Sequence, residues 1–170
     1  NKDGVADRKF PTYEEVVNAF EEKISSLSAE GARVDSITFS GNGEPTMHPD
    51  FPKIVDAVLE GRDRYFPQAK VSVLSNAFLV ERKSVAEALR RVDNPILKID
   101  ASTDELVRQI NKPVGSYRLD DIANALKGFE GNFILQTMFL RSPEFDTTAP
   151  EALHKWMNIV RELRPREIMV

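Results

Sequence analysis

Stretches patterned like helices alternate with stretches patterned like strands along nearly the whole chain. Apolar residues recur at helical spacing in residues 11–27, whereas apolar and polar residues alternate in residues 36–40, as in a strand with one buried face. Strands that are separated by helices form parallel βαβ units, so the sequence predicts an α/β fold. We expect strands at about 36–40, 69–77, 95–102, 132–141 and 166–170, and helices at 11–27, 51–61, 84–92, 102–110, 117–129 and 148–163.

The ends of three of these helices carry local signals. Thr12 with Glu15 three residues later matches a capping box, and so does Ser84 with Glu87. Gly61 is expected just past the end of the helix at 51–61, because glycine often terminates helices.

Residues 1–170 are expected to form a single α/β unit, since no linker or low-complexity segment interrupts the βα period. The chain opens with a polar segment that leads into a helix, without a preceding strand, and closes on apolar residues 168–170. We therefore expect a portion of a larger barrel-like domain.

Polar side chains occupy one face of several predicted strands. In "LKIDAS", Lys98, Asp100 and Ser102 share one row, opposite an apolar row, and Asn76 and Gln136 hold similar places in neighbouring strands. Parallel strands covered on both faces normally read as continuous apolar runs. The pattern favours a polar lumen that binds a ligand at the carboxyl ends of the strands, and the alternative is a Lys98–Asp100 ion pair at the sheet edge.

The loop after the first predicted strand reads Gly41, Asn42, Gly43, Glu44 and Pro45. The glycines let backbone approach a ligand closely, and the proline fixes the turn so that the carboxylate of Glu44 can accept from an ammonium group. Lys98 suits a carboxylate, and the amide and hydroxyl groups suit a ribose, so the ligand predicted is an amino acid attached to a ribose. Each motif also has a plainer interpretation: a simple turn at 41–45, a turn residue at Asn76 and a helix cap at Ser102.

Composition limits the classes of function. The sequence has no cysteine, which excludes disulfides and any thiolate metal site within this chain, and its two histidines, His48 and His154, share no metal-ligand spacing. The formal net charge of −4 gives no electrostatic reason to expect nucleic-acid binding. No apolar run has the length of a membrane span and the first ten residues lack the apolar core of a secretory signal, so a cytoplasmic location is expected.

Three stretches resemble motifs of the radical S-adenosylmethionine (SAM) enzymes. "FSGNGEPTMHPDF" is similar to the Gly-Gly-Glu motif of this family, "LSNA" to its Thr-Asn-Gly stretch and "LKIDAS" to its ribose-contacting strand. The resemblance implies part of a (β/α)6 partial TIM-type barrel, an α/β fold of parallel βα repeats that binds SAM and a [4Fe-4S] cluster. In this family the cluster, reduced by a donor such as flavodoxin or ferredoxin, cleaves SAM to a 5′-deoxyadenosyl radical that acts on a substrate, here unknown.

The resemblance also implies roles for individual residues. Gly43 and Glu44 would hold the methionine amino group, within a motif that includes Gly41, Asn42 and Pro45. Ser75 belongs to the second motif; Asn76, Lys98, Asp100 and Ser102 would line the methionine carboxylate or ribose, and Gln136 the adenosyl region. Glu44→Ala is expected to weaken SAM binding in the full-length enzyme with little loss of folding.

The departure from the family pattern is the missing cluster motif, three cysteines spaced C-x-x-x-C-x-x-C in the loop after the first strand. Residues 1–16 resemble the segment that follows this loop. We therefore expect a core fragment without the first strand, the cluster ligands and the completion of the last strand, inactive alone and with weak or no SAM binding. The alternatives are another α/β-barrel enzyme, such as an aldolase-like one, or a degenerate, non-catalytic binding module.

Overall fold

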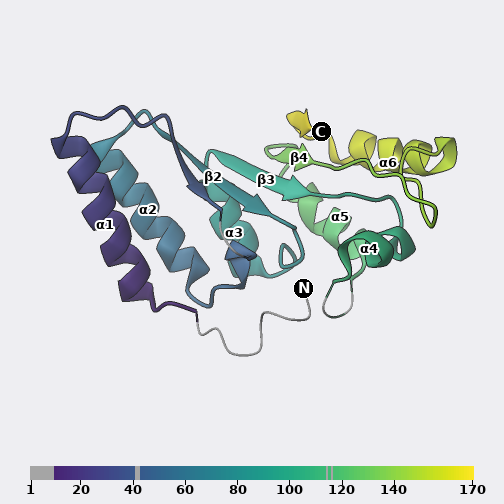
Figure 1. The fold of residues 1–170 in the computed structure, drawn as a ribbon, viewed down its shortest axis with the longest axis horizontal. Helices are drawn as coiled ribbons and strands as arrows, with labels where there is room; N and C mark the ends of the chain where they lie inside the picture. Colours follow the sequence, from purple (N-terminus) through teal and green to yellow (C-terminus); the bar gives the residue numbers. More distant parts are fainter. Residues whose placement is uncertain (1–9, 41–42, 114, 116) are drawn as a thin grey trace.

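The computed structural model describes residues 10–40, 43–113, 115 and 117–170. Its five strands are all parallel and lie in the order in which they occur along the chain, so each βα step adds one strand to the same edge (Figure 1). The predicted α/β fold of a partial TIM-type barrel is confirmed. The elements are α1 (Tyr13–Ala29), β1 (Ser36–Phe39), the 3-10 helix η1 (Pro45–Met47), α2 (Phe51–Tyr65), β2 (Lys70–Ser75), α3 (Lys83–Arg91), β3 (Asn94–Lys98), α4 (Asp104–Asn111), α5 (Leu119–Lys127), β4 (Ile134–Gln136), α6 (Pro150–Leu163) and β5 (Glu167–Met169).

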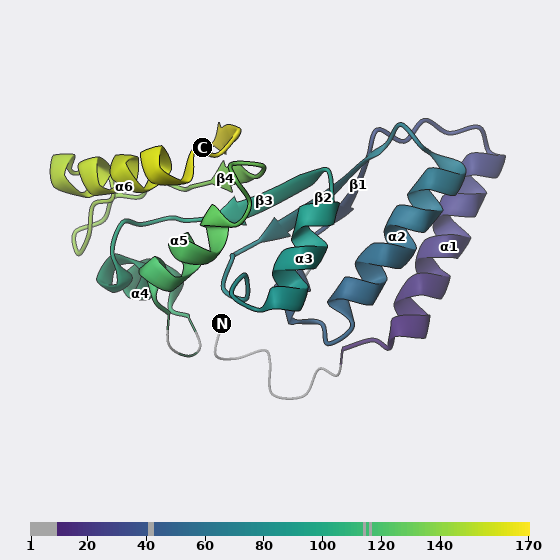
Figure 2. The same cartoon turned by 180° about the vertical axis from the view of Figure 1, so that it is seen from behind.

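The helices cover one face of the sheet. In Figure 1 the strands pass in front of α3, and in Figure 2, seen from behind, α3 lies in front of the strands. Val73, Leu97 and Leu135 point to this covered face and are fully buried. Together with Phe51 of α2 and Phe133 before β4 they form part of one continuous core.

The opposite face of the sheet carries the polar row that the sequence predicted. The strand register pairs Thr38 with Ser72 and Lys98 with Gln136, and paired residues project to the same face. Thr38 is exposed and Lys98 and Gln136 are half-buried. The polar row therefore continues from strand to strand, beside the buried Ile96 on the same face.

Two helix-end predictions are wrong. The capping box of Thr12 and Glu15 forms, but α3 begins at Lys83, one residue before Ser84. Glu87 lies 3.9 Å from the Lys83 amine instead of capping the helix start. Gly61 lies inside α2, which runs on to Tyr65. A glycine is needed there for packing, because a Cβ would lie 2.5 Å from the Phe20 ring of α1. The glycine permits the close approach of α1 and α2.

A charged cluster ties the amino-terminal edge of the sheet together. The Asp93 carboxylate accepts from Arg62 at 2.9 Å, from the Val71 amide at 2.9 Å and from Lys70 at 3.3 Å. The Asp93 side chain is only 25% exposed, so these bonds are partly shielded from solvent. Burial favours the neutral form, but the three hydrogen bonds outweigh it and hold the pKa of Asp93 below its usual range.

Asp93→Asn is therefore expected to lower the free energy of unfolding by about 2 kcal/mol near neutral pH. The pKa of this carboxyl is lower in the folded state than its unfolded value of about 3.9, so the stabilisation is present above that value and is lost as the pH falls through the folded-state pKa. Urea unfolding of both proteins at neutral and acid pH measures it, and the difference should shrink in acid. Asp56→Asn, which removes an exposed pair with Arg91, should change stability by about 0.5 kcal/mol or less at either pH.

Candidate functional site

The predicted site residues lie at the carboxyl-terminal edge of the sheet. Glu44 follows β1, Ser75 ends β2, Lys98 ends β3 and Gln136 ends β4. Consecutive parallel strands bring these ends side by side, as expected for a ligand site of a barrel-type fold. Gly41 and Asn42, also predicted, lie outside the described residues.

The Glu44 carboxylate is held by four hydrogen bonds from neutral donors. Its Oε1 accepts from the Thr46 hydroxyl at 2.6 Å, from the Thr46 backbone amide at 3.2 Å and from the Ser75 hydroxyl at 2.8 Å. Its Oε2 accepts from the backbone amide of Asn76 at 2.7 Å. Glu44 is half-buried, and within the described part of the chain it forms no ion pair. Its negative charge is thus fixed in place without a cation from the described protein.

Ser75 and Asn76 take part in this arrangement mainly through their own turn. The Ser75 hydroxyl donates to Glu44 and accepts from the Ala77 amide at 3.1 Å, and the Asn76 side-chain oxygen accepts from the Phe78 amide at 2.9 Å. Ser75 is buried, whereas Asn76 is exposed. The side-chain oxygen of Asn76 therefore has the role of a turn residue, as the plainer interpretation expected. Its side-chain nitrogen makes no hydrogen bond to another described residue.

Lys98 and Asp100 form the ion pair that the sequence analysis gave as an alternative, although β3 lies inside the sheet rather than at its edge. The Lys98 amine lies 3.0 Å from Asp100 Oδ2, and Asp100 Oδ1 accepts from the Met138 amide at 3.0 Å. The Asp100 side chain is fully buried, whereas that of Lys98 is 32% exposed. Lys98 is thus the member of the pair that a ligand can reach, and Asp100 orients it.

Ser102 is not the cap of the helix that follows it. Thr103 caps α4 by accepting from the Leu106 amide at 3.3 Å. The Ser102 hydroxyl oxygen is buried and has no hydrogen-bond partner among the described residues. A buried hydroxyl without a described partner, in the loop between β3 and α4, is suited to a polar ligand group.

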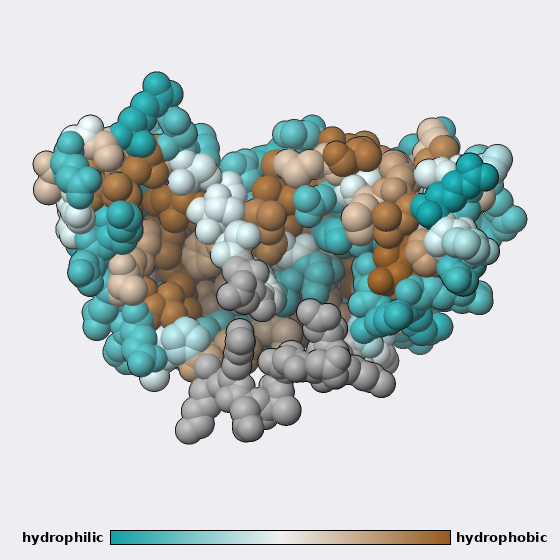
Figure 3. All heavy atoms as spheres, viewed as in Figure 1, coloured by the Kyte–Doolittle hydropathy of each residue, from teal (hydrophilic) through white to brown (hydrophobic). Residues whose placement is uncertain are grey.

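Gln136 borders a hollow of about 410 Å³ that is also lined by Lys98, Met138 and Val170. The wall of this hollow is partly apolar: Met138 is 41% exposed and Val170 80% exposed. Figure 3, viewed as Figure 1, shows hydrophobic surface near the C-terminal end of the chain. The hollow therefore joins a cation and an amide to an apolar wall, which suits a ligand with both polar and flat apolar parts.

The glycine and proline of the motif have separate structural roles. Pro45 opens η1, with Glu44 as its N-cap residue. A Cβ added at Gly43 would meet no described atom within 4 Å, so packing does not require a glycine at this exposed position. Space beside Gly43 is what a closely approaching ligand would need.

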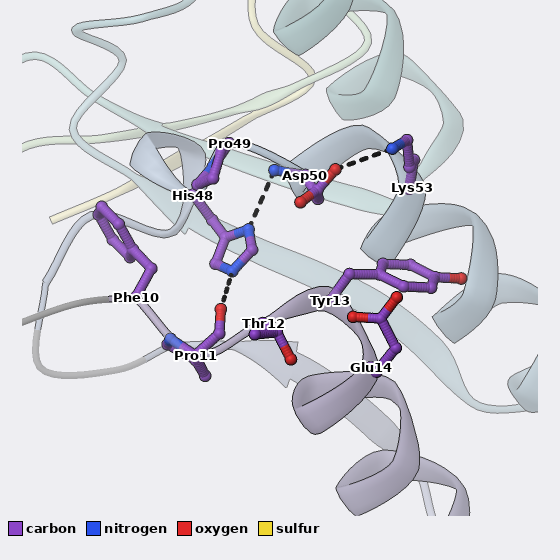
Figure 4. Close-up of a pocket in the computed structure, with 9 residues that line it drawn as sticks. All are labelled: Phe10, Pro11, Thr12, Tyr13, Glu14, His48, Pro49, Asp50 and Lys53. Atoms are coloured by element: carbon purple, nitrogen blue, oxygen red, sulfur yellow. Dashed lines mark hydrogen bonds and ion pairs between the residues drawn. The ribbon is translucent and has the colours of Figure 1, made fainter.

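A second hollow, of about 380 Å³, contains none of the predicted site residues (Figure 4). His48 lies within it, with Nε2 2.8 Å from the Pro11 carbonyl and Nδ1 accepting from the Asp50 amide at 3.1 Å. Both ring nitrogens are thereby engaged, so His48 joins the start of α1 to the turn before α2. Within the described ranges, no three acidic or histidine side chains gather as a metal site.

Thr46 was not among the predicted site residues, although it makes two of the four hydrogen bonds to Glu44. Its position after Pro45 was the available signal, because the first residues of a short helical turn lie next to the capping side chain.

None of the helices that the structure describes has the length and apolar character needed to cross a membrane.

A family model described as the radical SAM superfamily matches residues 4–140. The chain belongs to this superfamily. Its radical SAM region includes β1 to β4 and with them every strand end that carries a predicted site residue.

Three relatives of this radical SAM chain are between 24% and 29% identical to it over the aligned residues. A UPF0026 protein of Methanocaldococcus jannaschii is 28% identical over 164 residues, which cover 94% of this chain and 48% of that protein. A UPF0026 protein of Synechocystis is 29% identical over 141 residues, covering 81% of this chain and 49% of that protein. A protein named GTPase Obg from Brachyspira hyodysenteriae is 24% identical over 141 residues, 81% of this chain but only 20% of that protein. The chain spans about half the length of the two UPF0026 proteins.

Proposed function

We propose that this chain forms the SAM-binding side of a radical SAM enzyme that acts on a substrate still to be identified. The observation that carries the proposal is the Glu44 carboxylate, which four neutral donors fix at the end of β1 without a protein cation among the described residues. The ammonium group of a SAM methionine moiety would supply the missing positive charge.

The other residues at the strand ends fit the remaining groups of SAM. Lys98 has an accessible amine for the methionine carboxylate, and the Ser102 hydroxyl, which has no described protein partner, can bond a ribose hydroxyl. Gln136 and the apolar wall of its hollow would face the adenosyl part. Asp100 would act by orienting Lys98, since its own side chain is fully buried.

The residues of this chain do not fit a [4Fe-4S] cluster, because such clusters are held mainly by cysteine thiolates and the sequence has none. In the whole protein, a cluster bound by cysteines outside these 170 residues would supply the electron that cleaves SAM to the 5′-deoxyadenosyl radical. A flavodoxin or ferredoxin as electron donor and a cytoplasmic location belong to the same proposal.

The test uses the full-length protein, prepared without oxygen and supplied with iron and sulfide. A [4Fe-4S] absorption spectrum and the release of 5′-deoxyadenosine from SAM after reduction are expected. Binding of SAM without cleavage would contradict the enzymatic proposal and support a non-catalytic binding module. Failure to bind SAM would contradict the assignment of the site itself.

Gly43→Ala gives a sharper test of the site. An added methyl group meets no described protein atom within 4 Å, so the free energy of unfolding should change by less than about 1 kcal/mol. The methyl group would occupy the space assigned to the ligand, so SAM affinity, measured by equilibrium dialysis, should fall at least about tenfold.

Gly31→Ala is the matched control and should behave in the opposite way. Gly31 has a φ of +68° and no atom within 4 Å of an added Cβ, so alanine there should cost about 1 kcal/mol of stability. It follows α1, away from the strand ends, so SAM affinity should not change. Unchanged SAM affinity in Gly43→Ala would contradict the placement of the ligand beside Gly43.

A further inference from the structure

We infer that Thr46 is a positioning residue for the proposed SAM site and that it acts through Glu44. The inference rests on the proposed function, because it assigns to Glu44 the contact with the ligand's ammonium group. Thr46 is only 2% exposed, so it is not itself placed to touch a ligand. Its hydroxyl donates to Glu44 Oε1 at 2.6 Å, the shortest of the four hydrogen bonds that hold this carboxylate.

The donors are distributed unequally between the two carboxylate oxygens. Oε1 accepts from the amide and the hydroxyl of Thr46 and from the hydroxyl of Ser75, whereas Oε2 accepts from the Asn76 amide alone. A carboxylate oxygen has about two lone-pair positions, so Oε1 is fully occupied and one position remains on Oε2. The ammonium group of the ligand would therefore bond to Oε2.

Thr46 supplies two of the three donors to Oε1, and its hydroxyl makes the shortest of the hydrogen bonds to this carboxylate. Without its hydroxyl, Oε1 would lose its shortest hydrogen bond, and the Thr46 backbone amide and Ser75 would hold the carboxylate less firmly against rotation about its last bond, a torsion that is broad in glutamate. The hydrogen bond from the Thr46 backbone amide to the Glu44 side chain is enough to cap η1, so the hydroxyl is not needed to form the turn. Its effect should therefore be on the orientation of Glu44 more than on folding.

The experiment compares Thr46→Val, which is close to threonine in shape but lacks the hydroxyl, with Thr46→Ser, which keeps it. Affinities for SAM and for 5′-methylthioadenosine are measured by equilibrium dialysis on the full-length protein. The second ligand has the adenosyl part but neither the ammonium nor the carboxylate. Thr46→Val should bind SAM about tenfold more weakly, the loss expected for one charge-assisted hydrogen bond, and should bind 5′-methylthioadenosine as tightly as the wild type. Thr46→Ser should bind both ligands within about twofold of the wild type.

Ser75→Ala provides a second route if Thr46→Val folds poorly, because it removes the other hydroxyl that donates to Oε1. It should also weaken SAM selectively. Equal weakening of both ligands in these variants would indicate a merely structural role and overturn the inference, as would unchanged SAM affinity in Thr46→Val.

Glu44→Ala separates failure of the inference from failure of the proposed function. If Glu44→Ala weakens SAM binding while Thr46→Val does not, only the role of Thr46 is wrong. If Glu44→Ala leaves SAM affinity unchanged, or the wild type does not bind SAM, the proposed site and the inference both fail.

Discussion

Glu44→Ala is expected to weaken SAM binding by the full-length protein about a hundredfold and also to lower its stability. The loss of affinity follows from the loss of a charged contact to the ammonium group. The loss of stability follows from the donors left behind, since the Thr46 hydroxyl, the Ser75 hydroxyl and the Asn76 amide would all lose their acceptor. We expect the free energy of unfolding to fall by about 2 to 3 kcal/mol.

This expectation differs from the one based on sequence alone, in which Glu44→Ala leaves folding almost intact. The reason is that Glu44 joins the loop after β1 to the end of β2 through Ser75 and Asn76. SAM affinity by calorimetry and stability by urea unfolding are measured on the same preparation. Glu60→Ala, at an exposed position of α2, should change neither quantity. A variant that loses stability but binds SAM normally would show that Glu44 is only a structural link.

Gly131→Ala is expected to give the largest loss of stability, about 3 kcal/mol or more. Gly131 has a φ of +81°, and a Cβ there would lie 2.4 Å from the Arg164 carbonyl oxygen. The Gly131 carbonyl also accepts from the amides of Phe133 and Arg166, at 2.8 and 2.9 Å. The added Cβ would clash with a backbone atom, which cannot rotate away as a side chain can, so the clash is relieved only if the end of α6 moves away from the segment before β4.

The control for Gly131→Ala is Gly31→Ala, which has the same sign of φ but no clash. It should cost about 1 kcal/mol, so the difference between the two variants measures the backbone contact. Urea unfolding of both variants gives this difference. Equal losses in the two variants would mean that the loop at Gly131 moves freely to accept a side chain.

The order of elements and the two faces of the sheet could be predicted from the sequence, because both depend on local periodicity. The alternation in "LKIDAS" placed Lys98 on the polar face, and the register with Gln136 confirms that placement. Gly61 was misplaced for the opposite reason. Its role depends on Phe20, which lies on another helix and leaves no local signal in the sequence of α2.

The composition of the site could be predicted further than its hydrogen bonding. The sequence indicated which residues gather at the strand ends, but several of them bond to one another rather than standing free. Ser75 reaches Glu44 across 31 residues of sequence, and Asp100 reaches the Met138 amide across 38. Such pairings depend on register and on side-chain conformation, which a single sequence does not specify.

Arg166 connects parts of the chain that are far apart in sequence. Its guanidinium donates to the Asp93 carbonyl at 2.7 Å, to the Asn94 side chain at 2.7 Å and to the Asn132 side chain at 3.0 Å. Strand pairing also joins residues that are distant in sequence: Ser72 pairs with Asn94, and Ile134 with Glu167. Within the described ranges no two neighbouring strands are joined as a local hairpin, and we expect pairing over such separations to slow folding. We expect β5 to join late, because Arg166 can reach its three acceptors only after β3 and the turn before β4 are in place. Its contacts should then affect the rate at which β5 detaches more than the rate at which the sheet first forms.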